Sequence, residues 1–111
     1  MRYEEPRVGR REDLAAALTK GDVDGICRAL VSLSFYDTDW KWVEGACLSL
    51  LSNSDAAIRQ VAATCLGHVA RIHGRIDKDV VIPALMAMLD DEQVVGAAEN
   101  ALEDISIFVH E

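Results

Sequence analysis

The chain has 111 residues, half of them hydrophobic and 27% charged, and its formal net charge at pH 7 is −8. This length suits one domain, and a fold of this size buries roughly 65% of the surface of its unfolded chain, so a packed core is expected. The negative charge repels nucleic acid phosphates and anionic lipids, which argues against nucleic acid or a membrane as partner.

The N-terminus predicts a cytoplasmic protein with a short flexible tail. The segment MRYEEPRVGRRED is charged and lacks the apolar stretch of a signal peptide. Residues 1–10 mix charges with Pro6 and Gly9 without any period, whereas residues 11–111 are expected to form one domain. The longest apolar run, residues 80–89, is about half of the ~20 residues that span a bilayer, so no transmembrane helix is expected.

Helical periodicity runs through the whole domain, and the dipeptides that form β-hairpin turns are scarce, so the fold class is all-α. The pattern predicts about six helices, over residues 11–20, 22–35, 39–51, 55–73, 77–89 and about 92–109. Three cysteines, at positions 27, 47 and 65, lie on apolar helical faces. They are expected to be buried thiols in a reducing compartment, not disulfides.

The segment 50–74 contains the clearest helix. Ser54 is the expected N-cap, Asp55 suits the positive end of the helix dipole, and Gly74 is the expected left-handed C-cap. One apolar stripe recurs at three- and four-residue steps: Ile58, Val61, Ala62, Cys65, Leu66, Val69 and Ile72. The opposite face is small and polar, so another helix or a partner can approach it closely.

The fifth and sixth helices are less regular. The inner face of the fifth is expected to consist of Val80, Val81, Ala84, Leu85, Met88 and Leu89. Asp90, with Gln93 three residues later, resembles a capping box that starts the sixth helix near residue 92.

The two halves of the domain repeat each other. An offset of 38 aligns residues 42–51 with 80–89, and an offset of 36 aligns residues 55–69 with 91–105. A period of 36 to 38 residues with two helices per unit predicts a short α-solenoid.

The repeat contains two distinctive motifs. The pattern D-x-x-I-R-x-x-A-x-x-x-L-G begins at Asp55, and P-A-L-x-x-x-L-D begins at Pro83. With these motifs the chain resembles the HEAT family over about residues 39–106. The resemblance implies Asp–Arg ladders between repeats and second helices that line a concave surface. The last repeat departs from the pattern at Val95 and Glu103, as a capping unit would, and residues 11–35 match weakly, which leaves a first repeat there open.

More narrowly, the strings YDTDWKWV and LGHVARIHG make the chain similar to small HEAT-like immunity proteins of bacterial contact-dependent growth inhibition systems. This resemblance implies a cytoplasmic antitoxin that binds and blocks one toxin domain, a basic nuclease and in particular a ribonuclease. A general adaptor or scaffold would share every feature of the sequence and differ in having several partners. A small HEAT-like enzyme is the least favoured alternative.

Catalytic and metal signatures are weak. Cys65, His68 and His73 could suggest a metal site, but their phases differ and no fourth ligand is fixed by spacing, so neither a metal nor a cofactor is predicted. Glu99, Glu103 and Asp104 could suggest an acid pair for hydrolysis, but a solvated helix face explains them equally well. The chain is therefore not expected to be an enzyme.

The charge distribution favours a binding protein, because residues 74–111 carry two basic and nine acidic side chains. Such a surface attracts a basic protein. By the 36-residue offset, Gln60, Thr64 and His68 share a face with Gly96, Asn100 and Asp104, although this face could simply be the solvated side of two helices. Trp40 is expected in the core, and Trp42 is equally compatible with packing and with an interface anchor. The predicted partner-binding residues are Tyr36, Asp37, Asp39, Trp42, His68, Arg71, Glu99, Glu103 and Asp104.

Overall fold

The computed structural model describes residues 10–110, so nearly all of the predicted N-terminal tail lies outside the described residues. Six α-helices and a short 3-10 helix make up this part of the chain, and it contains no strand. They are α1 (Arg11–Lys20), α2 (Val23–Tyr36), α3 (Trp40–Leu50), α4 (Ala56–His73), α5 (Lys78–Ala87), η1 (Met88–Asp90) and α6 (Val95–Phe108). The all-α prediction with six helices is confirmed.

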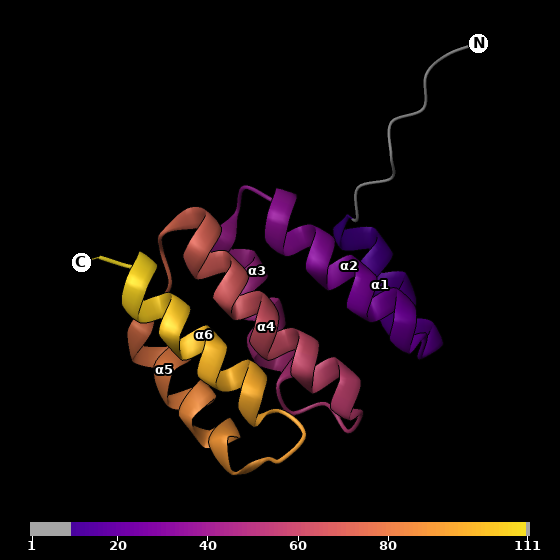
Figure 1. Cartoon of the computed structure of the whole chain (residues 1–111). Coiled ribbons are helices and arrows are strands. Elements are labelled where there is room, and N and C mark those ends of the chain that lie inside the picture. The colour runs from indigo at the N-terminus through magenta and orange to yellow at the C-terminus, as the bar shows by residue number, and fades with distance from the viewer. Residues whose placement is uncertain (1–9, 111) are drawn as a thin grey trace.

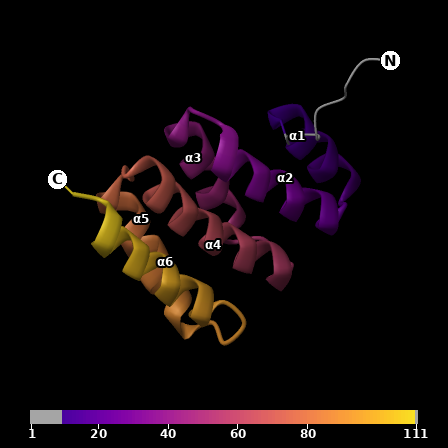
Figure 2. The same cartoon turned by 45° about the horizontal axis from the view of Figure 1, so that its top comes forward.

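The helices form three hairpins arranged in a row. α1 packs on α2, α3 on α4 and α5 on α6, while α4 also contacts α2 and α6. Figures 1 and 2 show α2, α4 and α6 side by side and roughly parallel, and in Figure 1 α3 and α5 lie behind them. The segment 11–35 thus forms a hairpin of the same kind, and α4 is the central helix of a short solenoid.

Aspartate side chains begin three of the helices. Asp22 accepts a hydrogen bond from the amide of Gly25, Asp39 from that of Trp42, and Asp55 from that of Ala57. The predicted N-cap at Ser54 is therefore wrong by one residue, because the Asp55 carboxylate reaches the Ala57 amide at 2.8 Å. Gly74 ends α4 in the left-handed region with φ 66°, as predicted.

The predicted start of the last helix near residue 92 is also wrong, since α6 begins at Val95. Asp91 explains the difference. One of its carboxylate oxygens accepts a hydrogen bond from the Gln93 amide at 3.0 Å, and the other lies 3.1 Å from Arg59 Nε. Asp91 therefore holds residues 92–94 in a turn, and the capping box expected from Asp90 does not form.

The expected inner face of α5 is too wide. Val81 and Leu85 are fully buried, but Val80 is 54% exposed. The regular helix ends at Ala87 and tightens into η1, so only a narrow stripe of α5 faces α6.

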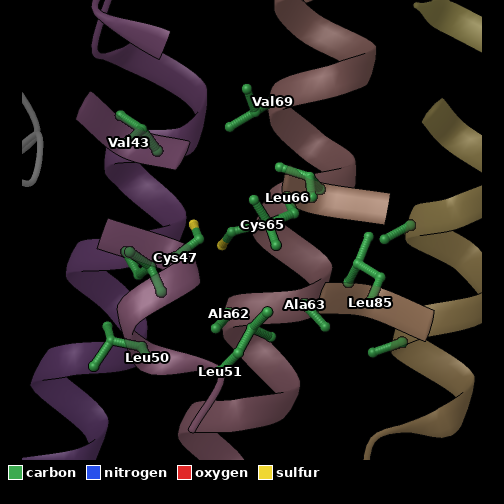
Figure 3. Close-up of a cluster of buried hydrophobic side chains, with 14 of the residues drawn as sticks. Val43, Cys47, Leu50, Leu51, Ala62, Ala63, Cys65, Leu66, Val69 and Leu85 are labelled. Atoms are coloured by element: carbon green, nitrogen blue, oxygen red, sulfur yellow. The ribbon is translucent and has the colours of Figure 1, made fainter. Parts of the chain in front are cut away.

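The core follows the predicted stripe of α4. Leu66, Val69 and Cys65 are fully buried against Val43 and Cys47 of α3, as Figure 3 shows. The Cys47 and Cys65 sulfurs point toward one another in this core, and both residues are free thiols. Cys27 is only partly buried, so the expectation of a buried thiol holds for two of the three cysteines.

The helices α4 and α6 approach closely at Gly67. A Cβ atom added there would lie 2.8 Å from Asp104 Oδ2 and 3.1 Å from Ala101 Cα, both on α6. Ala98 and Ala101 of α6 are also fully or almost fully buried. Small residues therefore set the distance between the second and third repeats, and α6 covers part of the small face that the sequence indicated.

An ion pair joins the same two repeats at the other end of α4. Arg59 Nε lies 3.1 Å from Asp91 Oδ2, and Arg59 Nη1 donates to the carbonyl oxygens of Asn53 and Ser54 at 2.9 and 3.0 Å. The side chains of Arg59 and Asp91 are only 18% and 26% exposed. The Asp–Arg ladder implied by the resemblance is confirmed at this junction.

A buried carboxyl group connects α3 to the start of α5. Glu44 of α3 is almost fully buried, and its Oε1 accepts a hydrogen bond from the Asp77 amide at 2.7 Å. Lys41 Nζ lies 3.2 Å from the Asp77 carboxylate. Burial is the main reason that the pKa of Glu44 is raised to about 7.

We predict opposite effects of alanine at two helical glycines. Gly45 has nothing within 4 Å of an added Cβ, so Gly45→Ala should stabilise the protein by about 0.5–1 kcal/mol through helix propensity. Gly67→Ala gains the same propensity but crowds Ala101 and Asp104, so it should be less stable than Gly45→Ala by about 1–3 kcal/mol. Urea unfolding of both variants tests this, and equal stability would show that the α4–α6 contact tolerates a methyl group.

We also predict that the stability falls between about pH 5 and pH 8 because of Glu44. Its raised folded pKa means that its contribution is full below the ordinary pKa of 4.5 and is lost as the pH rises through about 7. The loss should be on the order of 2 kcal/mol, less than the whole shift implies, because Lys41 and solvent near Asp77 screen the charge. Glu44→Gln keeps an acceptor for the Asp77 amide and should flatten this part of the pH profile of urea unfolding. Parallel profiles for the two proteins would contradict the prediction.

Candidate partner-binding face

The outward side of α2, α4 and α6, here called the second-helix face, carries a row of side chains in mutual contact. The Phe35 ring lies 6.3 Å from the Tyr36 ring and 4.8 Å from the His68 ring, measured between centroids. Arg71 Nη2 lies 2.9 Å from His68 Nδ1, and Arg71 Nη1 lies 3.8 Å from Asp104 Oδ2. These five residues, from Tyr36 to Asp104, are the central strip, and they connect three helices.

The strip contains four of the predicted partner-binding residues, namely Tyr36, His68, Arg71 and Asp104. Glu103 is exposed beside Asp104, and Glu99 is exposed one turn earlier on α6. The 36-residue offset therefore identified a face that the structure brings together. The partner-binding role of all these residues stays a prediction.

Phe35 is the member of the strip that was not among the predicted partner-binding residues. It is 41% exposed, and the neighbouring Tyr36 is 68% exposed. Ile72 of α4 was expected inside and is exposed. Phe35 and Ile72 are each the last but one residue of their helix, so exposed apolar side chains gather at the C-terminal ends of α2 and α4.

The state of His68 follows from this setting. Burial, reinforced by the positive charge of Arg71, lowers the pKa of His68 below its usual 6.5. The imidazole is therefore neutral at neutral pH, and Nδ1 is free to accept the hydrogen bond from Arg71.

Asp37 and Asp39 lie in the loop between α2 and α3, outside the strip, and their carboxylates bind Arg11. Arg11 of α1 contacts Asp37 through Nε and Nη2, at 3.0 and 3.2 Å, and Asp39 at 3.3 Å. Asp39 also caps α3, and its amide donates to Asp37. The Arg11 guanidinium lowers the pKa of Asp37. This cluster fixes α1 to the loop between α2 and α3, so these carboxylates have a structural role.

The two tryptophans differ less in burial than the sequence suggested, because both are partly buried and pack against the core. The Arg11 guanidinium lies 4.3 Å from the centre of the Trp42 ring. Trp42 also lines a shallow groove of about 390 Å³ between α1 and α3, together with Leu14, Leu18 and Leu50. Arg75 and Lys41 lie near the Trp40 ring, each 5.6 Å from its centre. Trp42 therefore lies on the side of α1 and α3, whereas the central strip joins α2, α4 and α6.

The third repeat has an unbalanced charge. Residues 79–110 contain no lysine or arginine and seven carboxylates: Asp79, Asp90, Asp91, Glu92, Glu99, Glu103 and Asp104. Asp91 pairs with Arg59 and Asp104 with Arg71. The other five form no ion pair with another described residue. Most of the uncompensated negative charge of this half of the molecule therefore lies on or near α5 and α6.

Neither a metal site nor a membrane segment stands out in the described part of the chain. Within residues 10–110, no three His, Cys, Asp or Glu side chains are grouped so that they could hold a metal ion. Cys65 is buried in the core, whereas His68 lies on the second-helix face. Among these residues no helix combines the length and apolar character needed to cross a bilayer.

Three hairpins whose second helices lie side by side, with an Asp–Arg ion pair between the second and third repeats, define a HEAT-type helical repeat protein. The HEAT repeat family model matches residues 45–73, which cover the second half of α3 and all of α4. No curated protein matches the chain.

Among solved structures, the chain is similar to a chain in the crystal structure of a CDI complex from Cupriavidus taiwanensis LMG 19424. The two are 32% identical, superpose with a TM-score of 0.81, and match over 97% of each chain. The chain therefore belongs to the family that its sequence resembled, the HEAT-repeat-like immunity proteins of contact-dependent growth inhibition (CDI) systems.

The Arg11 cluster generates a stability prediction. Because the folded pKa of Asp37 is lowered, its contribution is present above the ordinary pKa of 3.8 and is lost as the pH falls through the folded value. Arg11→Gln should lower the midpoint of thermal unfolding at pH 7, and this difference from the unmodified protein should shrink toward pH 3. Arg28→Gln, which removes the same charge from an exposed position of α2, is the control and should change the midpoint less.

Proposed function

We propose that this protein is an immunity protein that binds and occludes one toxin domain of its CDI system. The similarity to a chain of a CDI complex over 97% of both chains supports an immunity role. The HEAT-type fold and the same similarity also support a protein without enzymatic activity. The toxin would be neutralised by occlusion of its working surface, with no turnover. We further propose that the toxin is a cationic nuclease domain, in particular a ribonuclease.

The uncompensated carboxylates of the third repeat carry this proposal. Glu99 and Glu103 lie one turn apart on the exposed side of α6 and have no cation between them. Such a like-charge pair destabilises a helix by about 0.2–0.5 kcal/mol. A basic group of a partner would remove this repulsion on binding, which makes the α6 surface complementary to a cationic protein.

The ends of the second helices strengthen the same field. The C-terminal ends of α2, α4 and α6 lie at one side of the molecule, as the colours in Figure 1 show. Each free end of a helix carries the equivalent of about half a negative charge. Neither α2 nor α6 has a basic residue in its last turn to offset it. The α6 carboxylates lie on the same side of the molecule, so a cationic partner that approaches α6 meets these carboxylates and the helix dipoles together.

Exposed apolar side chains give the same face the character of an interface. Phe35 and Tyr36 of α2, Ile72 of α4 and Ile107 of α6 are all exposed. Aromatic side chains beside polar groups are enriched among the residues that dominate binding energy. We therefore propose that the toxin contacts the second-helix face, with the strip at its centre and α6 at its acidic edge.

The direct test is growth rescue. The proposal predicts that a toxin domain is encoded beside this gene. That domain should arrest growth when it is expressed alone, and co-expression of this protein should restore growth. Failure of rescue, with both proteins present and soluble, would contradict the proposed function. Capture of many unrelated proteins in place of that domain would favour a general adaptor.

The electrostatic part generates a kinetic prediction. The double variant Glu99→Gln/Glu103→Gln should associate with the toxin domain on the order of tenfold more slowly at low ionic strength, and this difference should shrink at high salt. Glu12→Gln/Asp24→Gln removes the same charge from exposed positions in the first repeat and is the matched control. Stopped-flow association measured at two salt concentrations checks the prediction. Equal rates for the two double variants would show that α6 does not guide the encounter.

A further inference from the structure

Arg71 is the exposed arginine of α4, and it lies on the second-helix face beside the acidic helix α6. The other arginine of α4, Arg59, is occupied by Asp91 and two carbonyl groups. α6 contributes no lysine or arginine. A toxin domain that is attracted by the carboxylates around α6 therefore meets one positive group, at the centre of the strip.

The guanidinium of Arg71 contacts one group of α4 and one of α6. His68 accepts a hydrogen bond from Nη2, and Asp104 of α6 lies 3.8 Å from Nη1. The His68 ring in turn lies against the Phe35 ring of α2, tilted by 36°. Asp104 can lie there because Gly67 leaves the space free, as a Cβ atom at that position would come within 2.8 Å of its carboxylate.

These contacts leave part of the guanidinium available. An arginine has five N–H donors in a planar fork, and the two contacts above use only a part of them. The side chain is still 41% exposed. A group that is already oriented loses less conformational freedom on binding than a free side chain does, so a partner gains more from contact with it.

We propose that Arg71 is a specificity-determining residue that pairs with a carboxylate of the cognate toxin domain. This inference rests on the proposed function. A carboxylate matches the planar fork of a guanidinium through two parallel hydrogen bonds. A nucleic acid phosphate would offer similar geometry, but the net charge of −8 repels nucleic acid. A basic toxin that presents a lysine or arginine at this point would meet a like charge, so Arg71 selects among toxins that the acidic surface attracts equally.

The two parts of the surface should separate in kinetics. Exposed charges at the edge of an interface act mainly on the association rate, whereas a central, hydrogen-bonded pair acts mainly on the dissociation rate. Variants at Glu99 and Glu103 should therefore change association, and variants at Arg71 should change dissociation.

The test measures both rates with the toxin domain encoded beside the gene. Arg71→Ala and Arg71→Lys should each increase the dissociation rate at least about tenfold and change the association rate only about twofold. Arg71→Lys should behave like Arg71→Ala because lysine keeps the charge but lacks the planar fork. Arg75→Ala is the charge-matched control, since Arg75 is exposed in the connection between α4 and α5, and it should dissociate at the rate of the unmodified protein. Dissociation of Arg71→Ala at that same rate would overturn the inference. Normal dissociation of Arg71→Lys would overturn the bidentate pairing.

Charge reversal makes the test independent of folding. Arg71→Glu should abolish growth rescue, and one Asp→Arg or Glu→Arg substitution in the toxin domain should restore it and thereby identify the carboxylate. A misfolded variant could not be restored by a change in its partner. If no acidic residue of the toxin restores rescue, the carboxylate pairing is wrong. If the unmodified protein fails to bind, the proposed function fails instead, so the two failures are distinguishable.

Discussion

The contact between α4 and α6 at Gly67 determines how the second-helix face is organised. Because Gly67 has no side chain, the backbone of Ala101 approaches it closely and the Asp104 carboxylate lies against it. Asp104 is thereby within reach of Arg71, which also contacts His68. A packing constraint between two repeats thus positions the polar groups at the surface. The same glycine that allows α4 and α6 to approach each other also brings Asp104 within reach of Arg71, the exposed arginine of α4.

Much of the fold was predictable because it depends on local sequence. The apolar stripe of α4, from Ile58 to Val69, follows from helical periodicity, and Gly74 follows from the need for a left-handed cap. Two errors depend on parts of the chain that are distant in sequence. Asp90 and Gln93 looked like the start of a helix, but Arg59 binds the carboxylate of Asp91, 32 positions later. Val80 looked internal by spacing, but no part of the described chain covers that side of α5, where it is exposed.

The candidate site was predictable to the extent that it depends on the repeat. The 36-residue offset placed His68 and Asp104 on one face, and the structure connects them through Arg71. The offset could not show that Asp37 and Asp39 are bound by Arg11, because such ion pairs join segments 26 and 28 residues apart and leave no period in the sequence. It also could not show that Phe35 is exposed, since exposure at a helix end depends on where the neighbouring helix ends.

Two groups of acidic side chains differ in their role. Asp37, Asp39 and Asp91 have arginine partners and hold helices and repeats together. Glu99 and Glu103 have no such partner among the described residues.

Glu103 occupies the position in the third repeat that Gly67 occupies in the second, and Val95 occupies the position of Arg59. In the second repeat these positions must accommodate α6 and bind Asp91. In the third repeat no described helix packs on them, so the packing constraint is absent and position 103 can carry a charge in solvent. The third repeat thus carries an acidic side chain where the second repeat packs against a neighbouring helix. This is why the proposed electrostatic attraction of a partner centres on α6.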